Sequence, residues 1–288
     1  MTEYMLNVSN LNKCYKKFKL QNVNLQLQKG EIMWFIGPNG AGKSTTIKSI
    51  MNIIPFDDGI ITVDGKNLNE NEIEIKQNIG YVGEHLDFYE KVKLKKIYKF
   101  TRKCYINWDV DLFASLVKRF DLDLEKKMNE LSKGMTVKFS LAMALAHHPK
   151  LLILDEPTSG LDPVIRNDLL DILKETVKKD NSAVLFSSHI TEDIAKIADT
   201  VAFIHNGEIK LISNKYSILE HYLKINTLNS IKDIKAIQVI IESDEKAIID
   251  ISNCTATEID MVKAKYEAKN ITLDELLLSI IKTHEKVS

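Results

Sequence analysis

A glycine-rich loop, Gly37-Pro-Asn-Gly-Ala-Gly42-Lys43-Ser44-Thr45, restricts the possible folds of this chain more than any other feature. It matches the pattern GxxxxGK[ST], follows the mostly apolar stretch 31–36, and precedes 44–50, where apolar and polar residues alternate at helical spacing. We therefore expect a strand, a loop and a helix. Such a loop curls its backbone N–H groups around a polyphosphate, and the helix N-terminus adds about half a positive charge. The phosphate-binding residues predicted here are Gly37, Pro38, Asn39, Gly40, Ala41, Gly42, Lys43, Ser44 and Thr45.

Two loop residues carry specific chemistry. Lys43 is expected to reach the β- and γ-phosphates of a bound nucleotide, and the Ser44 hydroxyl is expected to bind the Mg²⁺ ion that bridges them.

Downstream, Leu151-Leu-Ile-Leu-Asp155-Glu156 places two carboxylates at the end of an apolar strand. Asp155 is predicted as a second magnesium ligand, and Glu156 as the general base that activates water. A carboxylate that caps the next helix would explain one of the two acids but not both.

The rest of the chain predicts an α/β fold. Residues 151–154 and 183–186 are short apolar runs typical of buried parallel strands, and 164–178 has helical periodicity between them. Residues 200–205 and 208–212 flank Asn206-Gly207, a sequence that favours a type I′ hairpin turn. From about residue 215 the chain contains no Trp, Phe or Pro, which indicates a separate small domain. It is predicted to contain strands at 236–241 and 247–251 and a closing helix behind the capping box Thr272-Leu-Asp-Glu275.

Composition and charge exclude several classes of protein. The chain has 288 residues, with 39 Lys and Arg against 40 Asp and Glu, so no global charge favours nucleic acid. Its longest uncharged runs, 32–42 and 139–149, are far shorter than the roughly 20 apolar residues of a membrane-spanning helix. The start, Met-Thr-Glu-Tyr, lacks the features of a secretory signal, so we expect a cytoplasmic protein. Cys14, Cys104 and Cys254 are widely spaced and are expected to be reduced structural thiols.

These motifs and their order resemble the ATP-binding subunits of ABC transporters over about residues 1–214. In that family's terms the glycine loop is similar to the Walker A loop and 151–156 to the Walker B strand. Tyr15 resembles the aromatic residue that stacks on adenine, and Leu131-Ser132-Lys133-Gly134-Met135 resembles the signature segment. Ser159-Gly160-Leu161-Asp162 is similar to the D-loop. His189, which follows a predicted strand, resembles the switch histidine that contacts the γ-phosphate, although a lone histidine there is more often structural.

The resemblance implies a P-loop NTPase core with an antiparallel β subdomain and a helical signature subdomain at about 85–148. Residues 215–288 would then form a small α+β accessory domain. It also implies an ATPase that uses ATP and Mg²⁺ and dimerises on ATP. Each nucleotide would lie between one subunit's phosphate loop and the partner's Ser132, Lys133 and Gly134. Asp162 would belong to the same nucleotide site, and the protein would be peripheral on the inner face of the cell membrane.

Two positions depart from the family pattern. Glu84 stands where the family has the Q-loop glutamine; it can still ligate Mg²⁺, but its carboxylate adds a negative charge where the family has a neutral amide. Lys133 replaces a signature glycine, and Met135 replaces the signature glutamine. The Lys133 ammonium would face either the partner's γ-phosphate or solvent.

The variant signature, Glu84 and the C-terminal tail most resemble the ATPases of ABC-2-type exporters, in particular Gram-positive exporters of bacitracin-like peptides or phenol-soluble modulins. The partners implied are an ABC-2-type transmembrane permease and a second ATP-binding subunit, identical or different, with no nucleic acid. Residues 88–103 form a basic amphipathic stretch that would meet the permease or anionic lipid, or would be a solvated helix face. Its cations are Lys91, Lys93, Lys95, Lys96, Lys99, Arg102 and Lys103.

Two other functions remain open from the sequence. One is a soluble ABC ATPase that acts on ribosomes or nucleic acid, although the double cassette or long coiled coil of the known soluble types is not apparent. The other is a regulatory module that binds ATP with little turnover, with which the carboxylate of Glu84 is consistent.

Overall fold

A computed structural model describes residues 4–83, 90–188, 196–225, 237–242, 247–272 and 275–276. The chain divides into two compact units, Met1–Ile212 and Ser213–Ser288, which are described separately. Two predicted site residues, Glu84 and His189, lie outside the described residues.

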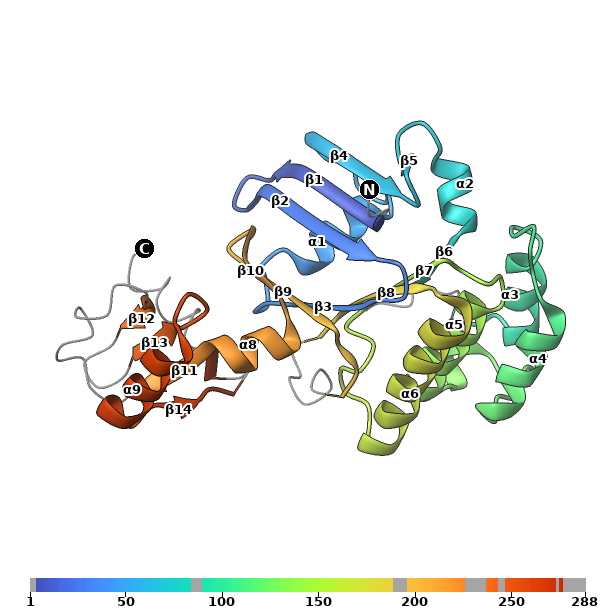
Figure 1. Cartoon of the computed structure of the whole chain (residues 1–288). Coiled ribbons are helices and arrows are strands. Elements are labelled where there is room, and N and C mark those ends of the chain that lie inside the picture. The colour runs from blue at the N-terminus through green and yellow to red at the C-terminus, as the bar shows by residue number, and fades with distance from the viewer. Residues whose placement is uncertain are drawn as a thin grey trace. The chain divides into compact units, whose positions relative to one another are not determined.

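A six-stranded sheet forms the centre of the first unit (Figure 1). Its strands are, in spatial order, β10 (Glu208–Asn214), β9 (Thr200–His205), β3 (Ile32–Ile36), β8 (Ala183–Ser187), β7 (Leu151–Asp155) and β6 (Ile79–Val82). The pairs from β9 to β6 are parallel. Strands β3, β7 and β8 are buried along their whole length, as their continuous apolar sequences predict. The α/β expectation is confirmed.

Helices lie on both faces of this sheet. The α1 helix (Lys43–Ile50) contacts β7, and α6 (Pro163–Asp180) contacts β8. The α5 helix (Lys133–Leu145) contacts β6. Because side chains alternate along a strand, Met33 and Phe35 of β3 pack in the core around α1, whereas Trp34 points to the opposite face.

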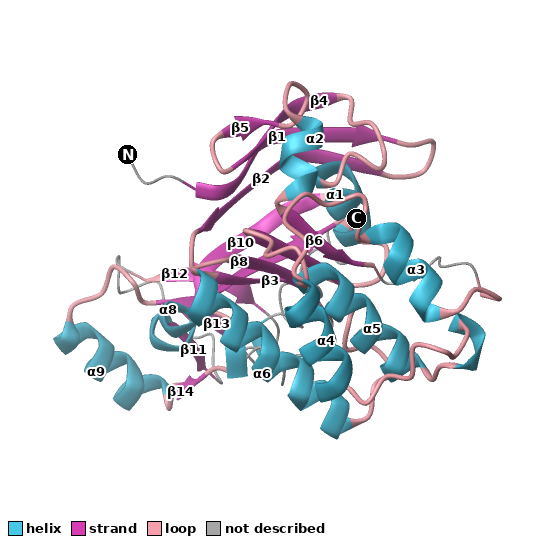
Figure 2. Cartoon of the chain, turned by 90° about the vertical axis from the view of Figure 1, so that its right-hand side faces the viewer, coloured by secondary structure: helices cyan, strands magenta, loops and turns pink. Residues whose placement is uncertain are grey.

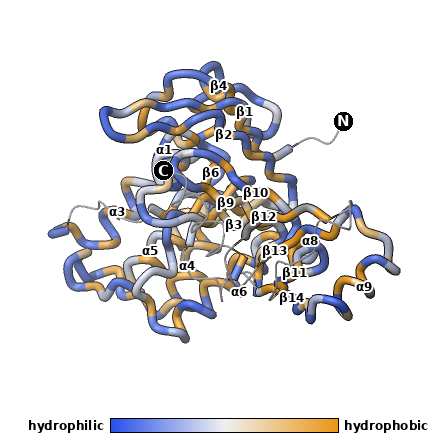
Figure 3. Tube along the Cα trace, turned by 90° about the vertical axis from the view of Figure 1, so that its left-hand side faces the viewer, coloured by the Kyte–Doolittle hydropathy of each residue, from blue (hydrophilic) through white to orange (hydrophobic). Residues whose placement is uncertain are grey.

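An antiparallel sheet packs over α1 on the first of these faces (Figure 1). Its strands are, in spatial order, β2 (Lys19–Gln28), β1 (Tyr4–Cys14), β4 (Asp58–Val63) and β5 (Lys66–Asn67). Buried and exposed residues alternate along much of β2, and Leu25 and Leu27 join the same core as Ile47 of α1. Figure 3 colours the chain by hydropathy and shows hydrophobic segments gathered at the central strands.

A helical subdomain contains α3 (Leu94–Thr101), α4 (Val110–Arg119) and α5; the short α2 (Glu72–Gln77) precedes β6 (Figure 2). In α3, Leu94 and Ile97 are buried, so the basic segment is amphipathic as predicted. Lys93 and Lys95 pair with Glu125. Hydrogen bonds from these two lysines, of which the one from Lys95 has the larger effect, lower the pKa of the Glu125 carboxyl to about 2. Part of the basic charge is therefore used within the fold.

The second unit contains an antiparallel sheet and two described helices. The strands are, in spatial order, β12 (Gln238–Glu242), β13 (Ala247–Asp250), β11 (Tyr222–Ile225) and β14 (Lys269–Asn270). The helices are α8 (Lys215–His221) and α9 (Ala256–Tyr266). Val262 and Tyr266 of α9 share a core with Leu223 and Ile249 of the sheet. The predicted capping box is present, since the Glu275 N–H donates to Thr272 Oγ1 at 3.2 Å and the Thr272 N–H donates to Glu275 Oε2 at 3.1 Å.

No helix in the described part of the chain combines the length and apolar character that crossing a membrane requires.

Asp64, in the turn between β4 and β5, connects the two sheets of the first unit. Its carboxylate lies 2.8 Å from Lys29 Nζ, just after β2, and 2.7 Å from Lys150 Nζ, just before β7. Hydrogen bonds from Lys150 and Lys29 lower the pKa of Asp64. The carboxylate is thus charged at neutral pH and ties the antiparallel sheet to the start of a central strand.

We expect Asp64→Asn to lower the free energy of unfolding by about 0.5–1 kcal/mol at pH 7, because it removes two partly exposed ion pairs while asparagine accepts the positive φ. Since the folded pKa lies below the ordinary 3.8, the stabilisation is complete above that value and is lost as the pH falls through the lower, folded pKa. Urea unfolding between pH 7 and pH 3 measures this, with Glu74→Gln, which removes the exposed pair with Lys66, as control. A difference that stays constant across this range would contradict the assignment.

Candidate functional site

The phosphate loop begins directly after β3 and ends in α1. Gly40 and Gly42 have φ values of 79° and 113°, a region that side chains with a Cβ rarely adopt. A Cβ on Gly37 would lie 2.2 Å from the carbonyl oxygen of Ile204 on β9. The loop therefore needs glycine at these positions both for its own turn and for its contact with the neighbouring strand.

The loop opens onto a cavity of about 670 Å³. It is lined by Lys17, Phe18, Pro38, Asn39, Gly40, Gly42, Lys43, Ser44, Thr45, Glu156 and Ser159. Gly37 and Ala41 of the predicted set do not line the cavity. The Gly37 carbonyl accepts from Lys43, and the Ala41 N–H donates to the Pro38 carbonyl at 3.1 Å. The structure thus brings the predicted phosphate loop and the predicted general base to one cavity.

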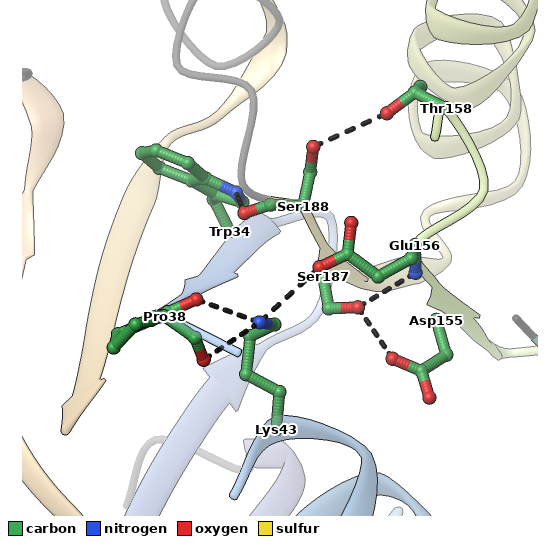
Figure 4. A network of polar contacts seen from close by, with 9 residues as sticks. Trp34, Pro38, Lys43, Asp155, Glu156, Thr158, Ser187 and Ser188 are labelled. Atoms are coloured by element: carbon green, nitrogen blue, oxygen red, sulfur yellow. Dashed lines mark hydrogen bonds and ion pairs between the residues drawn. The ribbon is translucent and has the colours of Figure 1, made fainter. Parts of the chain in front are cut away.

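Lys43 lies between the loop and Glu156 (Figure 4). Its ammonium donates to the carbonyl oxygens of Gly37 at 2.7 Å and Pro38 at 3.3 Å, and Nζ lies 3.3 Å from Glu156 Oε1. The two charged side chains are only 6% and 8% exposed. Burial of either charge alone would be costly, so the pair stabilises both groups at the edge of the cavity.

Ser187 organises Asp155, the last residue of β7, and Glu156, which follows it; the sequence did not predict this role. Its hydroxyl donates to Asp155 Oδ1 at 2.7 Å and accepts from the Glu156 N–H at 2.8 Å (Figure 4). Glu156 has a φ of 51°, an unusual value for a side chain of its size. A polar residue at the end of the apolar run 183–186 was the available signal, because Asp155 and Ser187 are register partners in the parallel sheet.

The residues predicted to bind Mg²⁺ suit that ion. Ser44 lines the cavity, and Asp155, 1% exposed, ends β7, whose next residue, Glu156, also lines the cavity. Among the described residues no group of three or more His, Cys, Asp and Glu side chains is placed to hold a metal ion. Mg²⁺ needs no such cage, because it typically takes one or two protein oxygens together with phosphate and water. A hydroxyl and a carboxylate beside a phosphate loop match that donor set.

Tyr15 follows β1 and is half-exposed at 48%. It lines a second cavity of about 470 Å³, which shares Lys17 and Phe18 with the phosphate-loop cavity. The two hollows are therefore neighbours, although Tyr15 itself does not line the first.

The signature and D-loop residues adopt local structural roles. The Ser132 hydroxyl accepts from the Met135 N–H at 3.3 Å and caps α5, and Asp162 accepts from the N–H groups of Val164 and Ile165 and caps α6. A Cβ on Gly134 would lie 2.7 Å from Ile165 Cδ1, which shows how closely the two helices approach.

Lys133 points toward the D-loop segment. Its Nζ lies 3.2 Å from the position that a Cβ on Gly160 would occupy. None of Ser132, Lys133, Gly134 and Asp162 lines the phosphate-loop cavity of the same chain.

The similarity to known proteins agrees with these features. Residues 20–159 match the protein family described as ABC transporter. The chain is 34% identical to the ABC transporter ATP-binding protein YtrB of Bacillus subtilis over 206 residues, which is 72% of this chain and 70% of YtrB. It is 32% identical to the bacitracin transport ATP-binding protein BcrA of Bacillus licheniformis, over 71% of this chain and 68% of BcrA. The solved structure of an ATP-binding subunit of an ABC transporter matches with a TM-score of 0.69 and 29% identity, over 75% of this chain and 92% of that one.

We expect Ser187→Ala to lower the free energy of unfolding by about 1–3 kcal/mol, because the buried Asp155 carboxylate loses a donor and the Glu156 N–H loses its acceptor. Nucleotide turnover should fall about 10- to 100-fold, since a small displacement of reacting groups has a large effect on rate.

The matched control is Ser182→Ala. The Ser182 hydroxyl is equally buried and donates to the Pro149 carbonyl at 2.8 Å before β8, away from both acids. It should lose stability while the folded protein retains its turnover. Urea unfolding and phosphate release separate the two effects, and equal turnover in the two variants would contradict a positioning role for Ser187.

Proposed function

The chain belongs to the ATP-binding subunits of ABC transporters, enzymes that hydrolyse ATP to drive transport, and from that membership we propose that it drives export of antimicrobial or amphipathic peptides through a separate permease. The observation that supports its catalytic part best is the shared cavity, in which the phosphate loop and Glu156 meet at Lys43. The similarity to a bacitracin transport protein supports the peptide substrate.

The Lys43–Glu156 pair suggests how ATP prepares the site. The loop amides and Lys43 would hold the β- and γ-phosphates, and these phosphates would compete with Glu156 for the Lys43 ammonium. Once its carboxylate is released from that ion pair, Glu156 would accept a proton from the attacking water. Ser44 and Asp155 would hold Mg²⁺, which offsets the charge of the phosphates. We assign a third magnesium contact to Glu84 and contact with the γ-phosphate to His189.

We propose that the remaining nucleotide contacts come from a second subunit. Ser132, Lys133, Gly134 and Asp162 lie outside the phosphate-loop cavity of their own chain, which supports a role toward a partner's nucleotide. Ser132 caps a 13-residue helix, so its hydroxyl and the first helical N–H groups form an end suited to an anion. Tyr15 would stack on the adenine base. Dimerisation on ATP and release after hydrolysis would then drive the permease.

We propose that the permease is of the ABC-2 type. The basic amphipathic segment, residues 88–103, would form part of the surface that contacts it. Its helix α3 buries Leu94 and Ile97, whereas Phe100 is 73% exposed. Two of its lysines are occupied by Glu125, so the remaining cations and the exposed aromatic ring would make the contact. The ATPase would then lie at the inner face of the membrane through its partner.

We expect Glu156→Gln to retain ATP binding but to lower the rate of phosphate release about 10²- to 10⁴-fold, the usual contribution of a general base. The neutral amide should also increase the fraction of ATP-bound dimer. Steady-state phosphate release and light scattering with ATP measure the two effects, and Lys43→Ala, which should lose ATP binding as well, is the comparison. Unchanged phosphate release would exclude Glu156 as the base.

Deletion of the gene for this chain should make the cell that carries it more sensitive to bacitracin-like or amphipathic peptides, because the ATPase that drives their export would be missing. Growth inhibition measures this, and the wild-type gene should restore resistance whereas Glu156→Gln should not. Unchanged sensitivity together with co-sedimentation on ribosomes would instead favour a soluble ABC ATPase. Restoration by Glu156→Gln would favour a regulatory module that only binds ATP.

A further inference from the structure

The Tyr15 ring is contacted by a neighbouring cation. Lys13 Nζ lies 5.5 Å from the centroid of the ring, within the range of a cation–π contact. The Lys13 side chain is only 13% exposed, which is unusual for a lysine. Its position beside the ring is therefore held by the surrounding fold.

Asp57 fixes this lysine from the segment before β4. Its Oδ1 accepts from Lys13 Nζ at 3.0 Å, and its Oδ2 accepts from the Cys14 N–H at 2.6 Å. The Asp57 N–H donates to the Asn12 carbonyl at 2.9 Å, so one residue binds the end of β1 at three consecutive positions. The bond from the Cys14 N–H and the contact with Lys13 hold the pKa of Asp57 below its usual range, so it is charged at neutral pH.

The ring itself lines the cavity that adjoins the phosphate-loop cavity, with Phe18 and Lys17 common to both. Lys13 is absent from the lining of either cavity. Its ammonium would therefore influence a ligand there through the ring rather than by direct contact. A cation on one face of an aromatic ring draws π-electron density toward it, which improves stacking of an electron-rich purine on the other face.

We propose that Lys13 and Asp57 are positioning residues that set the affinity for the purine base of the nucleotide by holding and polarising Tyr15. This inference rests on the proposed role of Tyr15 as the adenine-stacking residue. Holding the ring in its bound orientation reduces the entropy lost on binding. The pair acts on the base alone, because the phosphates are bound by a different part of the chain.

The test compares two ligands that share the phosphate contacts but differ in the base: ATP and inorganic tripolyphosphate, titrated calorimetrically into the full chain in EDTA. Lys13→Met should weaken ATP binding about two- to fivefold and leave tripolyphosphate binding unchanged. Asp57→Asn should act in the same direction. Lys13→Arg should retain the ATP affinity of the wild-type chain, because a guanidinium also stacks on an aromatic ring. In a Tyr15→Ala background, Lys13→Met should have no further effect on ATP affinity.

Lys66→Met is the matched control, since Lys66 belongs to the same antiparallel sheet and pairs with the carboxylate of Glu74 but contacts no aromatic ring that the structure describes. It should leave both affinities unchanged. Equal weakening of ATP and tripolyphosphate by Lys13→Met, or the same weakening without Tyr15, would overturn the inference and leave the ATPase assignment intact. If Tyr15→Ala left the ratio of the two affinities unchanged, both the stacking role and this inference would be wrong. If the wild-type chain bound neither ligand, the proposed function itself would fail.

Discussion

The ion pair between Lys43 and Glu156 is the interaction on which the site depends. Both groups are more than nine-tenths buried, and removal of one partner from such a pair typically costs about 3–5 kcal/mol because the other charge is left uncompensated. The pair also has a geometric requirement. Lys43 reaches Glu156 only because β3 and β7 lie on either side of β8 with their carboxyl ends at one edge of the sheet. The glycines of the loop then allow the chain to turn back toward that edge.

Much of this arrangement follows from local sequence. The loop from Gly37 to Thr45, the acids Asp155 and Glu156, and the buried strands β3, β7 and β8 are all recognisable from motif spacing and apolar runs. The Asn206-Gly207 turn is equally local, since both residues have a positive φ, which glycine adopts freely and asparagine tolerates better than most residues. These features are predictable because each is specified by residues close together in the chain.

The features that sequence reasoning missed are those set by distant residues or by irregular backbone. Ser187 contacts Asp155 only through the parallel register, and Asp57 meets Lys13 across 44 positions. Strand β1 was not predicted because its alternation of buried and exposed residues is interrupted. The pairing with β2 shifts register on both sides of Leu11, and Asn10 has a positive φ. In α9, Val262 and Tyr266 are the only residues that the structure shows buried, too narrow a stripe to identify the helix from periodicity.

Two adjacent hydroxyl residues explain why the loop after β7 holds its unusual backbone. Ser187 bonds to Asp155 and to the Glu156 N–H, while the Ser188 hydroxyl lies 3.3 Å from Thr158 Oγ1 and the Ser188 carbonyl accepts from Trp34 Nε1 at 3.0 Å. The loop that carries Glu156 is thus attached to the last residue of β8 and to the residue after it, and the latter also binds the large ring on β3. A positive φ at Glu156 costs conformational energy, and such strain persists only where neighbouring contacts over-determine it. The polar network therefore does more than satisfy buried groups: it holds the carboxylate beside Lys43, where a phosphate would compete for the same cation.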